Sequence, residues 1–190
     1  MRLDVSSAYG RVVSPFHCDG AGRISDKYYE STFMRQRLYI ETTIISYLSA
    51  KTSKDPIIAG RQALTRQWWE HRRAAFEVVV SELVFQEAAA GDLEAAKRRM
   101  DYILGMHSLR ISDDAVLLAE ALVTDGPIPV EYAEDALHIA LCAVNGIDFL
   151  VTWNCRHLAN AIHRHQIEEI VEKRGYGCPV ICTPEELMEE

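Results

Sequence analysis

Strand-like and helix-like patterns alternate along the chain from about residue 37 onward. Short runs of β-branched and aromatic residues, such as EVVVS at 77–81, are typical of buried strands. Between them, apolar residues recur every three or four positions, which is the spacing of one helix face. The predicted strands cover residues 37–41, 77–81, 108–112, 148–154 and 179–183. The predicted helices cover residues 56–76, 82–90, 93–106, 113–123, 131–146 and about 159–174, with a last helix entered at Pro184.

Polar residues mark the ends of several predicted helices. Ser81 and Asp92 precede helical segments and can accept hydrogen bonds from the free backbone N–H groups there. Gly91 suits a helix end, and Thr183 followed by Pro184 suits a helix start. These signals support the alternation of strands and helices.

Such alternation predicts an α/β fold of three layers, α/β/α, with a central, mostly parallel sheet of about five strands. The length of 190 residues, 48% of them hydrophobic, suits one domain, which we assign to residues 34–190. Residues 1–33 are rich in Ser and Gly and show no period, so we expect a disordered leader or a misassigned start.

The charge of the chain limits how it can bind nucleic acid. The net charge of −8 excludes a global positive field, so any contact with a polyanion must be local or neutralised by a metal or partner. The five cysteines include no CxxC pair, which indicates free thiols in a reducing compartment. No apolar run of about 18 residues occurs, so we expect a cytoplasmic protein without membrane contact.

Four polar residues lie at or just beyond strand ends, or on the core side of a helix: Glu41, Glu87, Asp135 and Asn154. In parallel sheets, ligands bind where the carboxyl ends of the strands meet. Three carboxylates gathered there would repel one another unless a divalent cation neutralised them. Oxygen ligands suit Mg²⁺ or Mn²⁺. Singly, each acid has an alternative role. Glu41 could be a strand-end acid paired with a basic side chain, Glu87 could belong to a structural hydrogen-bond network, and Asp135 could belong to an acidic first helical turn.

Three segments together form a specific sequence pattern, whereas any one alone would be weak. They are LYIETTIISYL at 38–48, VVVSELVFQEAAAGD at 78–92 and AEDALHIALCAVNGIDFLVTWN at 133–154. In this order, the chain from about Arg37 to Thr183 resembles a PIN domain, the fold of metal-dependent ribonucleases that includes VapC-type toxins of toxin–antitoxin pairs. The resemblance implies a Mg²⁺- or Mn²⁺-dependent endoribonuclease, an RNA substrate, an antitoxin partner and a homodimer.

The resemblance also assigns roles to individual residues. Glu41, Glu87 and Asp135 match the family's metal ligands, and Asn154 stands where many members carry a fourth acid. Thr43 and Thr152 match the hydroxyl residues that the family places beside the metal.

Two positions depart from the family pattern. Glu41 replaces the usual aspartate and has a side chain longer by one methylene, while Asn154 keeps an oxygen ligand without its charge. This favours one bound ion over two. The alternative is a catalytically weak PIN-like module that binds RNA or protein. A phosphatase or phosphotransferase is disfavoured because the chain has neither an Asp-x-Asp nucleophile nor a Gly-rich phosphate loop.

Further groups could contact RNA. Trp153, Arg156 and His157 follow the strand that leads to Asn154, although Trp153 could equally pack beneath the loop. Zinc ligation by Cys155, His157, His163 and His165 is disfavoured by their spacing, and a basic surface fits better. A second basic group surrounds Trp68 and Trp69, of which we expect one to be buried. The other could be available for stacking or a partner, although ordinary core packing beneath a solvated charged face fits this segment better.

Overall fold

A parallel five-stranded sheet lies at the centre of the structure, a computed structural model that describes residues 35–188. The predicted leader or misassigned start at residues 1–33 lies outside these residues. The strands are β1 (Arg37–Ile40), β2 (Glu77–Ser81), β3 (His107–Leu109), β4 (Phe149–Val151) and β5 (Val180–Cys182). Their order is β3-β2-β1-β4-β5, and all neighbouring pairs are parallel.

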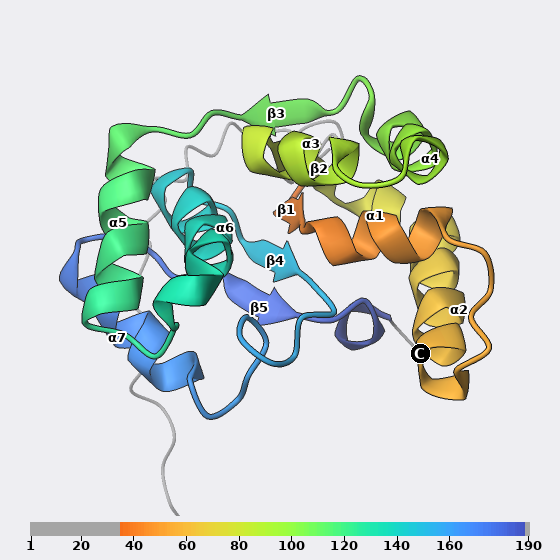
Figure 1. Cartoon of the computed structure of the whole chain (residues 1–190). Coiled ribbons are helices and arrows are strands. Elements are labelled where there is room, and N and C mark those ends of the chain that lie inside the picture. Colours follow the sequence, from red (N-terminus) through yellow and green to blue (C-terminus); the bar gives the residue numbers. More distant parts are fainter. Residues whose placement is uncertain (1–34, 189–190) are drawn as a thin grey trace, which may run out of the picture. The chain divides into compact units, whose positions relative to one another are not determined.

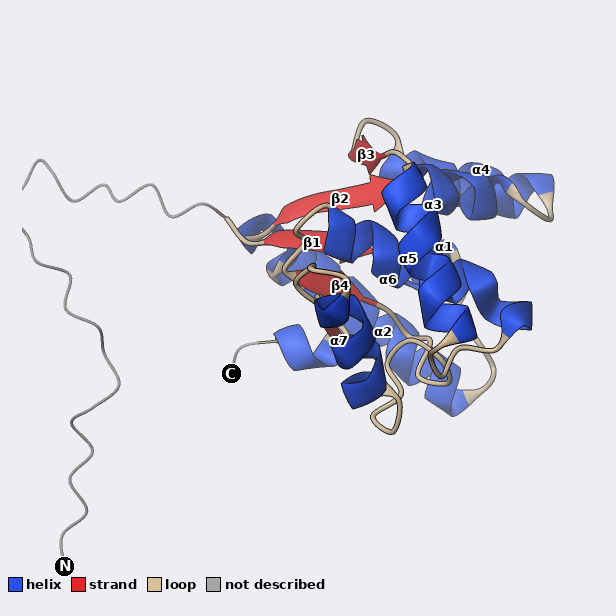
Figure 2. Ribbon diagram, turned by 90° about the vertical axis from the view of Figure 1, so that its left-hand side faces the viewer, coloured by secondary structure: helices blue, strands red, loops and turns tan. Residues whose placement is uncertain are grey.

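Seven α-helices surround this sheet in the described residues and complete the predicted three-layer α/β/α fold (Figures 1 and 2). They are α1 (Thr42–Ser49), α2 (Pro56–His71), α3 (Glu82–Ala89), α4 (Leu93–Ile103), α5 (Asp113–Thr124), α6 (Ala133–Val144) and α7 (Arg164–Lys173). Three short 3-10 helices cover Arg73–Ala75, Val130–Tyr132 and Glu185–Leu187. Helices α5 and α6 pack side by side, as Figure 1 shows. Within residues 35–188, no helix combines the length and apolar character needed to cross a membrane.

The central strand and one helix form the most buried part of the core. Leu38, Tyr39 and Ile40 of β1 have no exposed surface, because β1 pairs on both sides and is covered by helices. Helix α6 is buried along most of its length, as its nearly continuous apolar sequence predicts. Burying each large apolar side chain stabilises the fold by roughly 1.5–3 kcal/mol. Residues attached to β1 and α6 are therefore held in fixed positions.

Several element boundaries differ from the prediction. Helix α1 was not predicted, because its β-branched sequence has low helix propensity; the Glu41 side chain caps it by accepting the Thr43 N–H. Strand β4 ends at Val151, so Asn154 lies in the following turn. Strand β3 begins and ends earlier than expected, and Ser112 instead caps α5.

The C-terminal elements are also shorter than predicted. Helix α7 begins at Arg164, not near residue 159, and the helix expected after Pro184 is a 3-10 turn. The predicted Thr183 cap is not formed: Pro184 is the N-cap residue without a side-chain hydrogen bond, and the backbone N–H and hydroxyl of Thr183 instead donate to Glu186 Oε2 at 2.8 and 3.0 Å.

Candidate metal centre

Three parallel strands bring polar side chains to one edge of the sheet. Glu41 follows β1 and caps α1, Ser81 ends β2 and caps α3, and Thr152 follows β4. Figure 2 shows β2 leading with its arrowhead into α3. Because the strands are parallel, their carboxyl ends meet at this edge, which we call the carboxyl edge.

Glu41 is a buried carboxylate, only 5% exposed. Its Oε2 accepts hydrogen bonds from the Thr43 N–H at 3.1 Å, from the Thr43 hydroxyl and from the Thr152 hydroxyl at 2.8 Å. Among residues 35–188, no donor forms a hydrogen bond with the other oxygen, Oε1. Burial raises the pKa of Glu41, although nearby His138 and these hydrogen bonds oppose the shift. Both predicted supporting hydroxyls therefore lie against this carboxylate.

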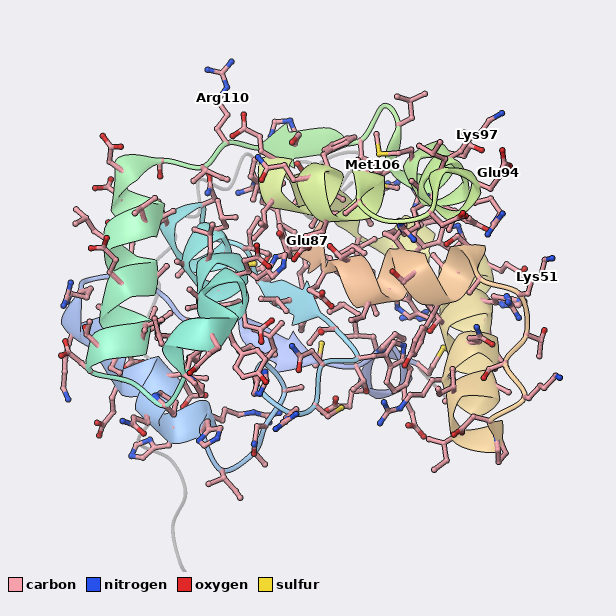
Figure 3. The ribbon with its side chains drawn as sticks, viewed as in Figure 1. Lys51, Glu87, Glu94, Lys97, Met106 and Arg110 are labelled. Carbon is pink, nitrogen blue, oxygen red and sulfur yellow. The ribbon has the colours of Figure 1, made fainter. Side chains whose placement is uncertain are left out.

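Glu87 projects from α3 toward the beginning of α1. Its Oε2 accepts a hydrogen bond from the Thr42 hydroxyl, and its two oxygens lie 3.3 and 3.4 Å from Nε2 of His138. Figure 3 shows Glu87 between the ribbons of α3 and α1, whereas Glu94 and Lys97 point outward from α4. Partial burial raises the pKa of Glu87, but the contacts with His138 and Thr42 outweigh it and lower the pKa overall.

His138 on α6 is 1% exposed and was not among the predicted site residues. Its Nδ1 lies 2.7 Å from the hydroxyl of Tyr39, which in turn lies 2.6 Å from the hydroxyl of Ser81. Burial lowers the pKa of His138, but the hydrogen bond and charge of Glu87, with the charges of Glu41 and Asp135, raise it overall. A signal was present, since His138 lies three residues after Asp135 on the same helix face and is polar within an apolar run.

Glu41, Glu87 and His138 form the compact group at this edge. Each offers one potential ligand atom, and these atoms lie within 4.8 Å of one another. We call these residues the Glu–Glu–His group. The structure thus brings together two of the three predicted carboxylates and adds a histidine.

Asp135 lies at the margin of this group with partners of its own. Its Oδ1 accepts a hydrogen bond from Nδ2 of Asn154 at 2.9 Å, and its Oδ2 lies 2.9 Å from Nδ1 of His157. Asn154 Oδ1 in turn accepts the backbone N–H of His157 at 3.1 Å. The Tyr132 ring lies against the His157 ring, with centroids 3.7 Å apart. Asp135, Asn154 and His157 thus form a second polar cluster beside the first.

The candidate RNA contacts have different surroundings. Trp153 is 7% exposed, and its Nε1 donates a hydrogen bond to Thr65 Oγ1 at 2.7 Å, so it takes the alternative position beneath the loop. His157 is partly buried against Asp135, whereas Arg156 is exposed and lies 6.0 Å from the centre of the Tyr132 ring. Of the three side chains, Arg156 is the one open to a phosphate.

The structure also describes the Trp68–Trp69 pair and the residues considered as zinc ligands near Cys155. Trp68 is fully buried, and Trp69 is partly buried against Tyr102 and beneath the Arg73 guanidinium. Across residues 35–188, the one cluster of His, Cys, Asp or Glu with metal-binding spacing is the Glu–Glu–His group. The disfavoured zinc site around Cys155 therefore has no ligand cluster in this part of the chain.

No family model and no curated protein sequence matches this chain. Functional inference for it therefore rests on the residues and geometry of the site.

Proposed function

We propose that this protein is a PIN-like, metal-dependent endoribonuclease that hydrolyses RNA phosphodiester bonds with Mg²⁺ or Mn²⁺. The observation that carries the proposal is the meeting of Glu41 and Glu87 with His138 at the carboxyl edge of a parallel sheet. By the resemblance in sequence, the proposal includes a cytoplasmic toxin that acts as a homodimer and is neutralised by an antitoxin.

The residues present fit a divalent cation. Glu41 is a desolvated carboxylate with a raised pKa and an oxygen that no donor in residues 35–188 satisfies. Burial makes the charged form of this carboxylate costly, and a cation beside it would offset that cost. Glu87 supplies a second negative charge from α3. Glu41 and Glu87 would therefore hold the ion, with Asp135 at its margin.

A divalent ion bound there supplies activation of an attacking water and stabilises negative charge on the attacked phosphate. The protein's own residues position and shield this chemistry. Thr43 and Thr152 fix the Glu41 carboxylate, and Thr42 fixes that of Glu87. Arg156, exposed beside the Asp135 cluster, can contact a substrate phosphate.

A second candidate is a catalytically weak binding module with the same fold. The observation that favours it is that both Asp135 oxygens already have partners, Asn154 and His157, so this acid is less available to an ion. Metal-dependent turnover of RNA separates the two functions.

The test is cleavage of labelled structured and single-stranded RNAs in Mn²⁺, Mg²⁺ or EDTA. Glu87→Gln and Asp135→Asn each remove one negative charge at nearly constant size, and Glu134→Gln removes one from the exposed neighbour of Asp135. Because a metal site contributes several kcal/mol to the transition state, Glu87→Gln should lose at least about 100-fold in rate. Asp135→Asn should lose a smaller factor, because Asp135 lies at the margin of the site. Glu134→Gln should retain activity.

Cleavage that survives EDTA, or equal rates in Glu87→Gln and Glu134→Gln, would refute the nuclease proposal. Metal binding without cleavage of any RNA by the folded protein would favour the binding module.

A further inference from the structure

His138 is held in the manner of a metal-ligating histidine. Such residues bind the ion through one ring nitrogen and donate the other N–H to an oxygen that fixes the ring. In this structure Nδ1 has the short contact, 2.7 Å to the hydroxyl of Tyr39, while Nε2 faces the carboxylates of the Glu–Glu–His group. Tyr39 is itself anchored by Ser81, which caps α3. His138 therefore has both features: one ring nitrogen that faces the carboxylates and one that is held by a hydroxyl oxygen.

The contact between His138 and Glu87 is longer than a short charge-assisted hydrogen bond. Charge-assisted N–H···O bonds are about 2.7–2.9 Å long, whereas Nε2 lies 3.3 and 3.4 Å from the two Glu87 oxygens. Two ligands that each lie about 2.1 Å from one ion are separated by roughly 3.0 Å at octahedral angles and roughly 3.4 Å at tetrahedral angles. The observed spacing lies between these two values, so it leaves room for a cation held by both side chains.

The competing ligand, Asp135, is less free. Asn154 and His157 engage both of its oxygens at 2.9 Å, whereas Oε1 of Glu41 has no donor within the described residues. His138 also lies in the compact group, and Asp135 does not.

We propose that Nε2 of His138 is a direct ligand of the metal, together with Glu41 and Glu87, and that the site prefers a first-row transition cation such as Mn²⁺ over Mg²⁺. The inference rests on the proposed metal-dependent function and refines its ligand set. An imidazole nitrogen suits first-row transition metals, most strongly those later in the series than Mn²⁺, whereas Mg²⁺ favours oxygen ligands. The Tyr39 and Ser81 hydroxyls then position the ring.

The test is electron spin echo envelope modulation of Mn²⁺ bound to the full-length protein, which detects nitrogen bonded directly to the ion. A ¹⁴N coupling should be present and should change to the ¹⁵N pattern when only histidine is ¹⁵N-labelled. His138→Gln should abolish the coupling and lower Mn²⁺ affinity at least ~10-fold, with a Mg²⁺ change below about threefold. His157→Gln should retain the coupling.

Because His138 is buried, His138→Gln could fail to fold, and two measurements remain decisive in that case. The isotope experiment uses the unaltered chain, and Tyr39→Phe removes only the hydroxyl at Nδ1. Tyr39→Phe should keep the nitrogen coupling while weakening Mn²⁺ binding by roughly 10-fold, the lower range for loss of an outer partner.

Each contrary result has a distinct meaning. Mn²⁺ bound without nitrogen coupling would overturn the ligand role of His138 and leave a carboxylate site and the proposed nuclease intact. If the coupling is lost in His157→Gln but kept in His138→Gln, the bound nitrogen belongs to His157, and the inference is overturned. No Mn²⁺ or Mg²⁺ binding at all would overturn both this inference and the proposed function.

Discussion

Replacing Thr152 by Val tests how the carboxyl edge holds its buried acid. The Thr152 hydroxyl is fully buried, donates to Glu41 Oε2 at 2.8 Å and accepts the Asn154 N–H at 2.9 Å. Val has nearly the same shape as Thr but can neither donate nor accept these hydrogen bonds. Losing a buried hydrogen bond to a charged group costs about 1.5–3 kcal/mol, and an unpaired, partly buried N–H adds about 1 kcal/mol. We expect a total loss of about 2–4 kcal/mol in the free energy of unfolding.

The assay is urea unfolding at pH 7 in EDTA. With a slope near 2 kcal/mol/M for a chain of this size, the midpoint should fall by about 1–2 M. Thr183→Val is the matched control, because it removes a hydroxyl-to-carboxylate bond to exposed Glu186. That change should cost less than about 1 kcal/mol. Equal effects of the two substitutions would refute the reasoning that Glu41 depends on buried donors.

Three further predictions follow from the site and its surroundings. Mn²⁺ at about 100 times its Kd should stabilise the fold by about 2.7 kcal/mol and raise Tm by roughly 5–11 °C in calorimetry, and Glu41→Gln should abolish the shift. In EDTA, the Glu87–His138 pair should contribute to the free energy of unfolding between pH 4.5 and 6.5. The contribution should be lost as pH falls below 4.5 through the lowered pKa of Glu87, and also as pH rises above 6.5 through the raised pKa of His138. The urea unfolding midpoint measured across pH tests both losses, and Glu87→Gln should weaken this pH dependence. Trp153→Phe should cost about 1–2 kcal/mol through its lost bond to Thr65 and leave RNA cleavage within about twofold, whereas a large loss of cleavage at unchanged stability would indicate direct RNA contact.

The sheet and most helices were predictable because their signals are local. The run EVVVS at 77–81 became β2 with the predicted bounds, and the Ser81 and Asp92 caps form as expected. Helix α1 was not predictable from propensity, because its stability comes from the Glu41 cap and the burial of Ile44, Ile45 and Leu48. Tertiary packing decided that element.

The candidate site was predictable only in part for a related reason. Sequence order and strand ends identify Glu41 and Glu87, but they do not identify the third side chain of the group. His138 occupies an apolar helix, and its polarity alone does not distinguish a satisfied core histidine from a site residue. Only the fold reveals that Tyr39, from β1, meets one ring nitrogen while Glu87, from α3, meets the other.

Glu41 and Asn154, where the sequence departs from the family it resembles, both affect where negative charge lies at the carboxyl edge. An acid at residue 154 would face the Asp135 carboxylate, whereas the Asn154 amide donates to it at 2.9 Å and His157 holds its other oxygen. Asp135 is thereby drawn into a hydrogen-bonded cluster of its own. At residue 41, the longer glutamate caps α1, reaches the hydroxyl of Thr152 across the sheet edge and keeps Oε1 without a donor in the described residues. We infer that the negative charge available to cations is concentrated on Glu41 and Glu87 beside His138, which suits one ion and not two.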